Sequence, residues 1–540
     1  MQSPNTPSVD APMAHLLVGL LLGLPLARFF SVPPLPLLLL SLVVLIGARH
    51  LSGRFFWYPL FWIAVTLAAW AYGEIRLPEA PEESLLCRPA REATLTIQIR
   101  RIYQANDRYG KTSGLGIVQT APWESRLAAG DRIYFSFSTK KESTALYPGQ
   151  SLRCTGLLRP LPLQADRVSQ TKAAALEFTE YLRSLGVYYR FERNGPFLSI
   201  DPPPPMQSLY RHLNKRFREA LCLGAPEKGN RQGIYIAMLL GQKNELKQSQ
   251  KEAFKSTGTL HLFAISGLHI GVIALTLAQA LRLARIPNAV AHWIGLSVLF
   301  LYVGVIGATP SAVRAFLMTA FYWISFSCDR QRSPFAALIG SAVFVLCVLP
   351  EQLWSVGFQL SYSVVASILL LGLPLNEQLC QHLRPYAWLP QGSWSQWHKW
   401  ADLCLTKVYL LFSISLSAWL ASAPFCAVYF GVFAPGGILL NMLLVNLATL
   451  VIVGGVISIS ATLLTLHPVA EFINHAAWVN LSLMEGLIGQ FQKIPGAFVS
   501  CPAFPQAWMY SLLTGYYAVL LYSAKRRQTL RKTRPNALAP

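Results

Sequence analysis

The sequence carries few charged side chains. Aspartate, glutamate, lysine and arginine make up only 13% of its 540 residues, whereas soluble domains carry about 25%. Hydrophobic residues reach 53%, and the mean hydropathy is +0.38. Several apolar runs approach or exceed the roughly 18–20 residues that span a bilayer. This composition excludes an ordinary soluble protein and predicts a polytopic α-helical membrane protein.

Several chemical motifs are also absent from the sequence. The nine cysteines form no CxxC pair and no Cys/His cluster with zinc spacing, so we expect no metal site. No G-x-x-x-x-G-K-[ST] phosphate loop occurs, and we therefore expect no ATP hydrolysis by this polypeptide. No cofactor is expected.

Acidic residues are scarce as well. The chain has 25 acidic residues against 46 basic ones, which gives a formal net charge of +21. One interpretation is that the basic excess lies in cytoplasmic loops, as is usual in membrane proteins. The other is that it attracts a polyanionic partner. Charge alone favours the first interpretation.

Three apolar runs open the chain, at about 13–31, 33–48 and 55–73. We interpret the first as a retained transmembrane helix, because no basic residue precedes it. The loop before the third run carries Arg49 and Arg54, which places this loop and the N-terminus in the cytoplasm. The N-terminal transmembrane region 1–73 therefore ends on the outer side of the membrane.

Nine further apolar runs follow the polar middle of the chain. They bring the total to about 12 spans and return the C-terminus to the cytoplasm, which agrees with the basic tail at 525–540. These runs lie at about 259–281, 288–308, 309–327, 334–349, 352–372, 406–429, 436–463, 468–490 and 505–524.

Residues 74–205 are polar and alternate like β-strands. The stretches ATLTIQIRRIY, TSGLGIVQT, DRIYFSFSTK and QSLRCTGLLRP are separated by turn residues. Four or five such strands with one helical stretch predict an exported OB-like small β-barrel. Cys87 and Cys154 both lie in this segment, and an oxidising compartment favours a disulfide between them.

The linker at 206–258 begins with a basic amphipathic helix, MQSLYRHLNKRFREALCL. Its apolar residues follow helical spacing, and Arg211, Lys215 and Arg216 are among the basic residues that fill the other side. Such a helix is typical of a membrane surface, where it binds anionic headgroups. A contact with nucleic acid is the alternative, and both remain open.

Polar residues interrupt several apolar runs of the transmembrane domain 259–524. A lipid-facing polar group is costly, so these residues usually face the bundle interior or a water-filled path. Their coincidence in one bundle favours a hydrophilic channel. The predicted pore-lining residues are His261, Ser266, Gly267, His269, Ser311, Arg314, Gln359, Ser361, Asn441 and Asn446.

The stretch HLFAISGLHIG contains four of these residues. Ser266 and Gly267 predict a break in the helix. The alternatives are close helix packing at Gly267 and, for His269 taken alone, a satisfied core histidine. Because Ser266 and His269 are three residues apart, they also suggest an intramembrane Ser/His hydrolase. The transmembrane domain has few carboxylates that would orient the histidine, which disfavours a hydrolase.

The residues TGTLHLFAISGLHIG resemble the signature of the ComEC competence family, the inner-membrane DNA-uptake channels of naturally transformable bacteria. The stretches GQKNEL, TPSAVRAFLMT, LPEQLWSVGFQLSYSVV and SAPFCAVYFGVFAPGGILLNMLLV follow in the family's order. The resemblance implies a channel that passes single-stranded DNA across the cell membrane during natural transformation. A transporter of another anionic polymer or of a lipid-linked substrate on the same scaffold is the alternative.

The resemblance also implies partners. Many relatives carry a metallo-β-lactamase-like domain, but no HxHxDH motif occurs in this sequence, which is either a short member or a truncated chain. A separate nuclease, a cytoplasmic ATPase or helicase and an exported DNA-binding protein are therefore expected. The sequence leaves the oligomeric state open.

The resemblance further implies DNA contacts on the exported side of the membrane. Basic residues would bind phosphates and aromatic residues would stack on bases. The structural alternative for the aromatic residues is the barrel core. The predicted contacts are Tyr109, Trp123, Tyr134, Arg211, Lys215 and Arg216.

Overall fold

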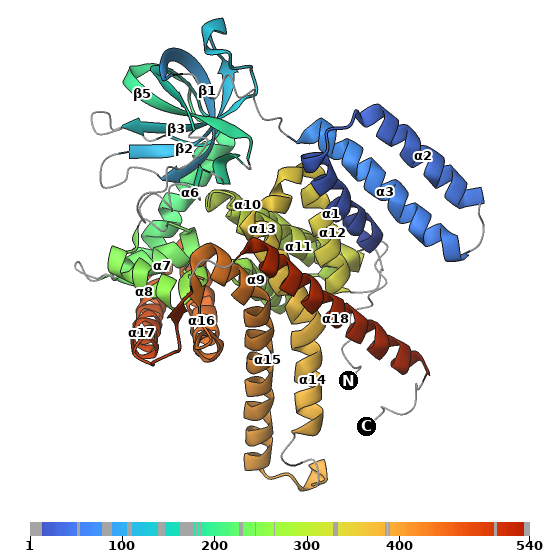
Figure 1. The fold of residues 1–540 in the computed structure, drawn as a ribbon. Helices are drawn as coiled ribbons and strands as arrows, with labels where there is room; N and C mark the ends of the chain where they lie inside the picture. The colour runs from blue at the N-terminus through green and yellow to red at the C-terminus, as the bar shows by residue number, and fades with distance from the viewer. Residues whose placement is uncertain are drawn as a thin grey trace. The chain divides into compact units, whose positions relative to one another are not determined.

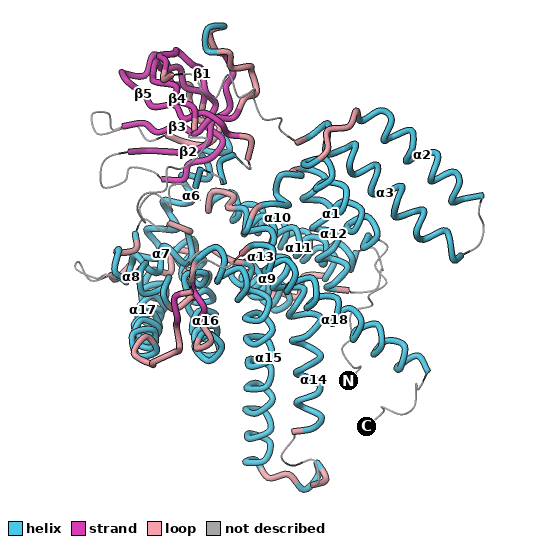
Figure 2. Tube along the Cα trace, in the orientation of Figure 1, coloured by secondary structure: helices cyan, strands magenta, loops and turns pink. Residues whose placement is uncertain are grey.

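The chain divides into two compact units, residues 72–215 and residues 1–71 with 216–540. Strands dominate the smaller unit and helices the larger one (Figure 2). The computed structural model describes residues 13–50, 54–77, 89–104, 111–138, 146–161, 178–179, 181–183, 185–225, 231–242, 245–263, 265–327, 333–383, 386, 389–501 and 505–533.

The smaller unit is a closed five-stranded barrel. Its strand order is β1-β2-β3-β5-β4, and β4 pairs with β1 to complete the circle. The pairing of β3 with β5 is parallel, and all other pairings are antiparallel. The prediction of a small β-barrel is confirmed, and five strands suit the OB type. The strands are β1 (Arg91–Gln104), β2 (Lys111–Thr120), β3 (Arg132–Ser138), β4 (Ser151–Pro160) and β5 (Val187–Ile200).

Alternation along the strands builds the barrel core. On β3, Ile133, Phe135 and Phe137 are fully buried, while the residues between them are only partly covered. Gly114 on β2 gives the ring of Phe135 room, because a Cβ at Gly114 would lie 2.8 Å from the end of that ring. The period of two therefore decides which side chains fill the interior.

Helices form nearly all of the larger unit (Figure 1). The helix α6 (Pro205–Cys222) runs from one unit into the other. The other helices are α1 (Met13–Phe29), α2 (Pro34–His50), α3 (Arg54–Arg76), α7 (Arg231–Leu240), α8 (Gln248–Ser256), α9 (Gly267–Leu283), α10 (Asn288–Val305), α11 (Pro310–Ser327), α12 (Pro334–Val348), α13 (Val356–Ser367), α14 (Leu373–His382), α15 (Gln396–Phe430), α16 (Gly437–Leu463), α17 (His467–Phe491) and α18 (Gln506–Thr533).

Within the described residues, four helical segments are long and apolar enough to cross a bilayer. They are Thr259–Leu283, Val356–His382, Gln396–Phe430 and Gly437–Leu463. Other apolar helices are shorter, with α1 and α12 among them. The total of about 12 spans therefore remains a prediction.

Two of the predicted spans have internal features that position the site. The run 259–281 is a short 3₁₀ turn (Thr259–Leu262) and a separate helix, because α9 begins only at Gly267. The predicted break at Ser266 and Gly267 is therefore present. The run 352–372 starts as a helix at Val356 and continues beyond its predicted end, through a π-helical turn (Ile368–Gly372) into α14. α14 lies beside α15 (Figure 1).

A buried asparagine anchors the end of α6 to the helical unit. Asn474 on α17 is fully buried, and its Nδ2 donates to the carbonyl oxygens of Ala220 at 2.9 Å and Leu223 at 3.1 Å. The last carbonyl groups of a helix lack partners within the helix. Asn474 supplies a hydrogen-bond donor for these carbonyl groups, so α6 ends against α17.

Candidate functional site

The N-termini of α9, α11 and α13 lie side by side. The Ser311 hydroxyl on α11 donates to the carbonyl of Ile265, just before α9, at 2.7 Å. One turn later, the Arg314 guanidinium donates to the carbonyl of Gly357 at the start of α13, at 2.8 Å. The start of α11 therefore joins the starts of α9 and α13. We call these three helix ends, with Ser311 and Arg314, the N-terminal cluster.

Local sequence explains why each of the three helices begins there. Ser266 is the N-cap of α9, and Ser355 is the N-cap of α13, where its Oγ accepts from the backbone N–H of Phe358 at 3.2 Å. Helix α11 starts at Pro310, whose fixed φ suits a first helical position and which has no N–H to satisfy. Caps and proline thus set the three ends, and packing brings them together.

The N-terminal cluster carries positive charge. Each helix N-terminus is equivalent to roughly half a positive charge, and Arg314, only 5% exposed, adds a full one. Glu351, a buried carboxylate in the turn before α13, offsets part of this potential. Helix N-termini of this kind bind anions such as phosphate. The arrangement is chemically suited to hold an anion.

Ser266 and His269 form a helix cap. The Nδ1 atom of His269 lies 3.0 Å from the Ser266 Oγ and 3.3 Å from its backbone nitrogen. A backbone N–H can only donate, so Nδ1 accepts and the neutral ring carries its proton on Nε2. The two residues make a reciprocal capping box. The three-residue spacing also suggested that these two residues form a catalytic dyad. The cap accounts for their closeness.

The second ring nitrogen of His269 has no acceptor among the described residues. The side chain is fully buried, and an unmet buried donor costs about 1–3 kcal/mol. Among the described residues, His269 is therefore not a core histidine with both ring nitrogens hydrogen-bonded. In the same region, Gly267 is exposed. A Cβ added at this glycine would lie 3.9 Å from the Cβ of Ala315.

The remaining predicted pore residues do not gather at one point. His261 is exposed, and its Nδ1 pairs with the Gly258 carbonyl at 2.9 Å. Gln359 lies one turn into α13 and donates to the carbonyl of Leu353 at 2.9 Å. Ser361 is half-buried on the same helix. We place them around the N-terminal cluster, not within it.

The two predicted asparagines lie on α16. Asn446 is exposed and donates to the carbonyl of Met442 in its own helix at 2.8 Å. The Oδ1 of Asn441 is buried and has no donor among the described residues. α16 packs on α9 and on the 3₁₀ turn before it, so Asn441 is the asparagine of greater interest.

A cavity of about 350 Å³ lies between α9, α11, α12 and α13. Its lining is apolar and includes Ala274, Met318, Leu338 and Leu369. None of the ten predicted pore residues, all of which the structure describes, lines it. This cavity is therefore not a polar channel.

Sequence reasoning missed a polar seam between α13 and α18. On α13, Gln359 and Ser363 are four residues apart and share a face. Gln359 lies 3.4 Å from the Tyr510 hydroxyl, and the Tyr517 hydroxyl donates to the Ser363 carbonyl at 2.6 Å. Four residues further along α13, Ser367 pairs with the Tyr516 hydroxyl at 2.6 Å. The i, i+4, i+8 spacing of polar residues on α13 was the signal that could have revealed this seam.

Arg527 extends the same seam towards the end of α18. Its guanidinium donates to the carbonyl of Leu370 at 3.1 Å, within the π-helical turn. A π-helical turn disturbs the regular i→i+4 ladder, so its carbonyl groups are open to an outside donor. Helix α18 is thus bonded to α13 over more than two turns.

The predicted DNA contacts on the barrel have different environments. Trp123 is 82% exposed. Tyr134 is half-buried against Tyr103 and Phe178, so part of its ring is already covered. Tyr109 lies outside the described residues. Of the two described rings, Trp123 is the more open.

Cys87, one half of the predicted disulfide, lies outside the described residues. Its proposed partner Cys154 lies in the barrel core, where burial raises the pKa of the thiol to about 12. At neutral pH this thiol is protonated and unreactive.

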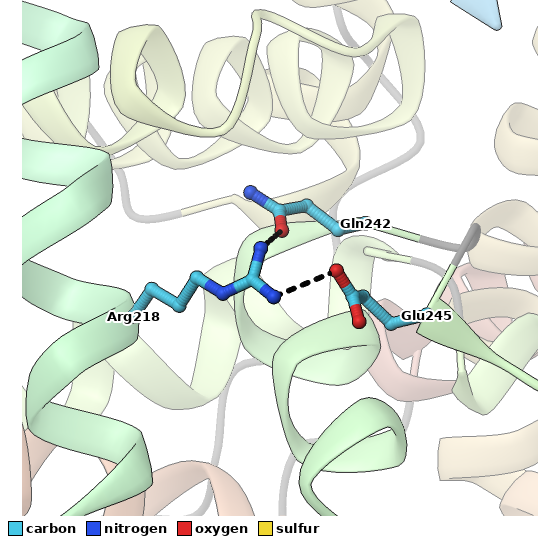
Figure 3. A network of polar contacts seen from close by, with 3 residues as sticks. All are labelled: Arg218, Gln242 and Glu245. Atoms are coloured by element: carbon cyan, nitrogen blue, oxygen red, sulfur yellow. Dashed lines mark hydrogen bonds and ion pairs between the residues drawn. The ribbon is translucent and has the colours of Figure 1, made fainter. Parts of the chain in front are cut away.

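The basic residues of α6 are exposed, but some already have structural contacts. The Arg211 guanidinium lies over the Tyr147 ring, 4.9 Å from its centroid. Arg218 reaches from α6 to Glu245 at 2.9 Å and to Gln242 at 3.4 Å, as Figure 3 shows. The predicted contacts Lys215 and Arg216 are also exposed. The helix therefore combines anchoring arginines with an exposed basic surface.

Comparisons with known proteins place this architecture in a family. The chain is 26% identical to ComE operon protein 3 of Bacillus subtilis over 64% of its own length and 40% of that protein. It is 28% identical to Recombination protein 2 of Haemophilus influenzae over 38% of its length and 27% of that protein. For Competence protein ComA of Neisseria gonorrhoeae, the identity is 29% over 29% of this chain and 23% of that protein. The chain thus spans less than half the length of these relatives.

No solved structure matches the chain. The family model described as Competence protein matches residues 238–527, more than half of the sequence and all of the N-terminal cluster. The chain therefore belongs to the Competence protein family.

Proposed function

We propose that this chain forms a membrane path for single-stranded DNA during natural transformation. The observation that carries the proposal is the N-terminal cluster, where Ser311 and Arg314 join three helix N-termini. It lies within the segment that matches the Competence family. The names of the relatives, among them a competence protein and a recombination protein, support a role in DNA transfer.

The physics of the cluster suits a phosphate backbone. Broken transmembrane helices in transporters direct their N-termini towards anionic groups of the substrate. Helix α9 begins at such a break, and α11 and α13 begin beside it. One buried arginine and the partial charges of the helix N-termini attract phosphates, but they are too few positive charges to bind the strand tightly. A translocation path requires binding weak enough to allow release.

The proposal includes a topology and partners. About 12 spans would cross the cell (inner) membrane, with both termini cytoplasmic and the barrel on the outer side. A separate nuclease, a cytoplasmic ATPase or helicase and an exported DNA-binding protein would complete the machinery. The exposed ring of Trp123 would stack on bases at the barrel.

We propose no catalysis by this chain. Among the described residues no carboxylate accepts from the Nε2 of His269, so the pair lacks the third group that orients a catalytic histidine. The cap explains the 3.0 Å approach of Ser266 and His269 without a reaction.

Deletion of the gene in its host tests the proposal. Labelled donor DNA should still reach the cell surface, while entry of a single strand into the cytoplasm should be abolished and restored by the wild-type chain. Unchanged entry in the deletion strain would contradict the proposal. Loss of uptake for another anionic polymer such as polyphosphate, with DNA entry intact, would favour the alternative substrate.

A further inference from the structure

The further inference concerns the buried nitrogen of His269, which the cap leaves unused. The Nδ1 atom faces the backbone N–H of Ser266 at 3.3 Å, so the proton of the neutral ring is on Nε2. The side chain is 0% exposed, and no described residue accepts from Nε2. Nearly all buried donors in native proteins have an acceptor. His269 therefore presents an oriented donor for which an acceptor is expected.

The position of this donor indicates the class of the acceptor. His269 lies in the first turn of α9. Ser311 bonds to the chain just before this turn, and Arg314 connects the same end of the bundle to α13. Three helix N-termini and a guanidinium favour an anion over a neutral acceptor.

We propose that the Nε2–H of His269 donates a hydrogen bond to a phosphodiester oxygen of the translocating strand. The assignment rests on the proposed function and adds a specific contact to it. Because the ring is enclosed, the contact forms when the N-terminal cluster separates to admit the strand. A neutral N–H donor replaces the hydration of a phosphate oxygen without adding a fixed charge, so the strand can move on.

The substitution His269→Asn isolates the proposed donor. The Oδ1 of asparagine takes the place of Nδ1 and keeps an acceptor for the Ser266 N–H, but this shorter side chain ends before the position of Nε2. The chain supplies a matched control, since Ser395 and His398 form the same capping box on α15, with Oγ to Nδ1 at 2.7 Å. His398→Asn makes the same chemical change at a cap that is not buried.

The measurement is binding of dye-labelled (dT)20 by the full chain in lipid nanodiscs. A hydrogen bond to a charged group typically contributes enough for an affinity change of about tenfold or more. We expect this loss for His269→Asn and a change within twofold for His398→Asn. If His269→Asn binds like the wild type while Arg314→Ala binds weakly, the His269 contact is wrong and the proposed path stands. If the wild-type chain itself does not bind (dT)20, the proposed function fails.

A second measurement does not depend on how the variant folds. In wild-type chain labelled with [15N]histidine, addition of (dT)20 should shift one buried Nε2–H resonance, whereas polyglutamate, an anionic polymer without phosphate, should not. An Nε2–H resonance that is insensitive to (dT)20 would overturn the proposal.

Discussion

The same four-residue motif, Ser-x-x-His, begins helices α9 and α15. In both, the serine and histidine cap each other, with backbone N to Nδ1 distances of 3.3 Å and 3.2 Å. At α15 the cap is partly exposed, and His398 rests against the Tyr386 ring, 4.6 Å between centroids. At α9 the histidine is fully buried beside two other helix N-termini.

The comparison shows that a local motif has a structural role wherever it occurs, whereas its surroundings decide whether it also has a functional one. A Ser–His contact alone would assign catalysis to both sites. Burial of the histidine at the N-terminal cluster and an unmet donor distinguish the first site from the second. Five predictions test this contrast between buried groups and exposed groups of the same kind.

The largest effect is expected for Arg314→Ala. Loss of the bond to the Gly357 carbonyl removes a hydrogen bond from a charged group, about 1.5–3 kcal/mol, and removes the full positive charge from the N-terminal cluster. Single-strand entry should fall at least tenfold. The matched control is Arg218→Ala, an exposed arginine paired with Glu245, which should change the free energy of unfolding by about 0–1 kcal/mol. Equal uptake by both variants would remove Arg314 from the path.

The next effect concerns the capping serines. Loss of an N-cap costs about 0.5–2 kcal/mol, and we expect Ser266→Ala to lie near the top of this range and Ser395→Ala near the bottom, measured by thermal unfolding. Ser266→Asn keeps a capping side chain but has no hydroxyl nucleophile. It should retain DNA uptake. Loss of uptake in a stable Ser266→Asn protein would favour the hydrolase.

Cysteines extend the comparison to the barrel. Cys154 is buried, with a pKa raised by burial to about 12, whereas Cys404 on α15 is exposed. N-ethylmaleimide should label Cys404 rapidly at pH 7–8 and leave Cys154 unmodified until the barrel unfolds. If Cys154 is bonded to Cys87, labelling after unfolding will additionally require a reductant.

The raised pKa of Cys154 also makes the stability of the barrel depend on pH. The folded barrel favours the neutral thiol, so this stabilisation is complete below the ordinary pKa of 9.0 and is lost as the pH rises towards about 12. Burial raises the pKa of Tyr103 as well, which acts in the same direction. Cys154→Ala should reduce the pH dependence of unfolding between pH 9 and 12, and an unchanged dependence would exclude the thiol as a contributor.

The smallest effect is expected in the polar seam. Tyr517→Phe removes the bond to the Ser363 carbonyl, and hydrogen bonds between membrane helices average about 0.6 kcal/mol. Tyr522, 70% exposed on the same helix, is the matched control. Thermal unfolding should detect a small loss for Tyr517→Phe and none for Tyr522→Phe. A loss above about 2 kcal/mol in the free energy of unfolding would indicate that the seam contributes more to the stability of the bundle than these contacts suggest.

Much of the fold follows from patterns within short stretches of the sequence. Strand alternation predicts the barrel, and the alternating residues Phe135 and Phe137 of β3 are buried in its core. The apolar runs predict most helices, and the Ser266-Gly267 pair predicts the break before α9. The continuation of α13 through a π-helical turn was not predicted, because apolar residues fit an α-helix and a π-helical turn equally well.

The candidate site depended on contacts between distant residues. Arg314 and Gly357 are 43 positions apart, and Ser311 and Ile265 are 46 apart. No periodicity reports which helix starts face each other. For the same reason, sequence reasoning placed Gln359 in the pore set, while its neighbours place it in the seam with α18.

The sequence by itself determined the local devices: where helices begin, which residues cap them, and which strand faces turn inward. These depend on interactions within about one turn or between alternating positions along one strand. The tertiary structure alone decided which cap is buried, which three helix ends meet and which donor lacks an acceptor. The physical reason is that burial and convergence arise from the packing of segments that are far apart in the chain.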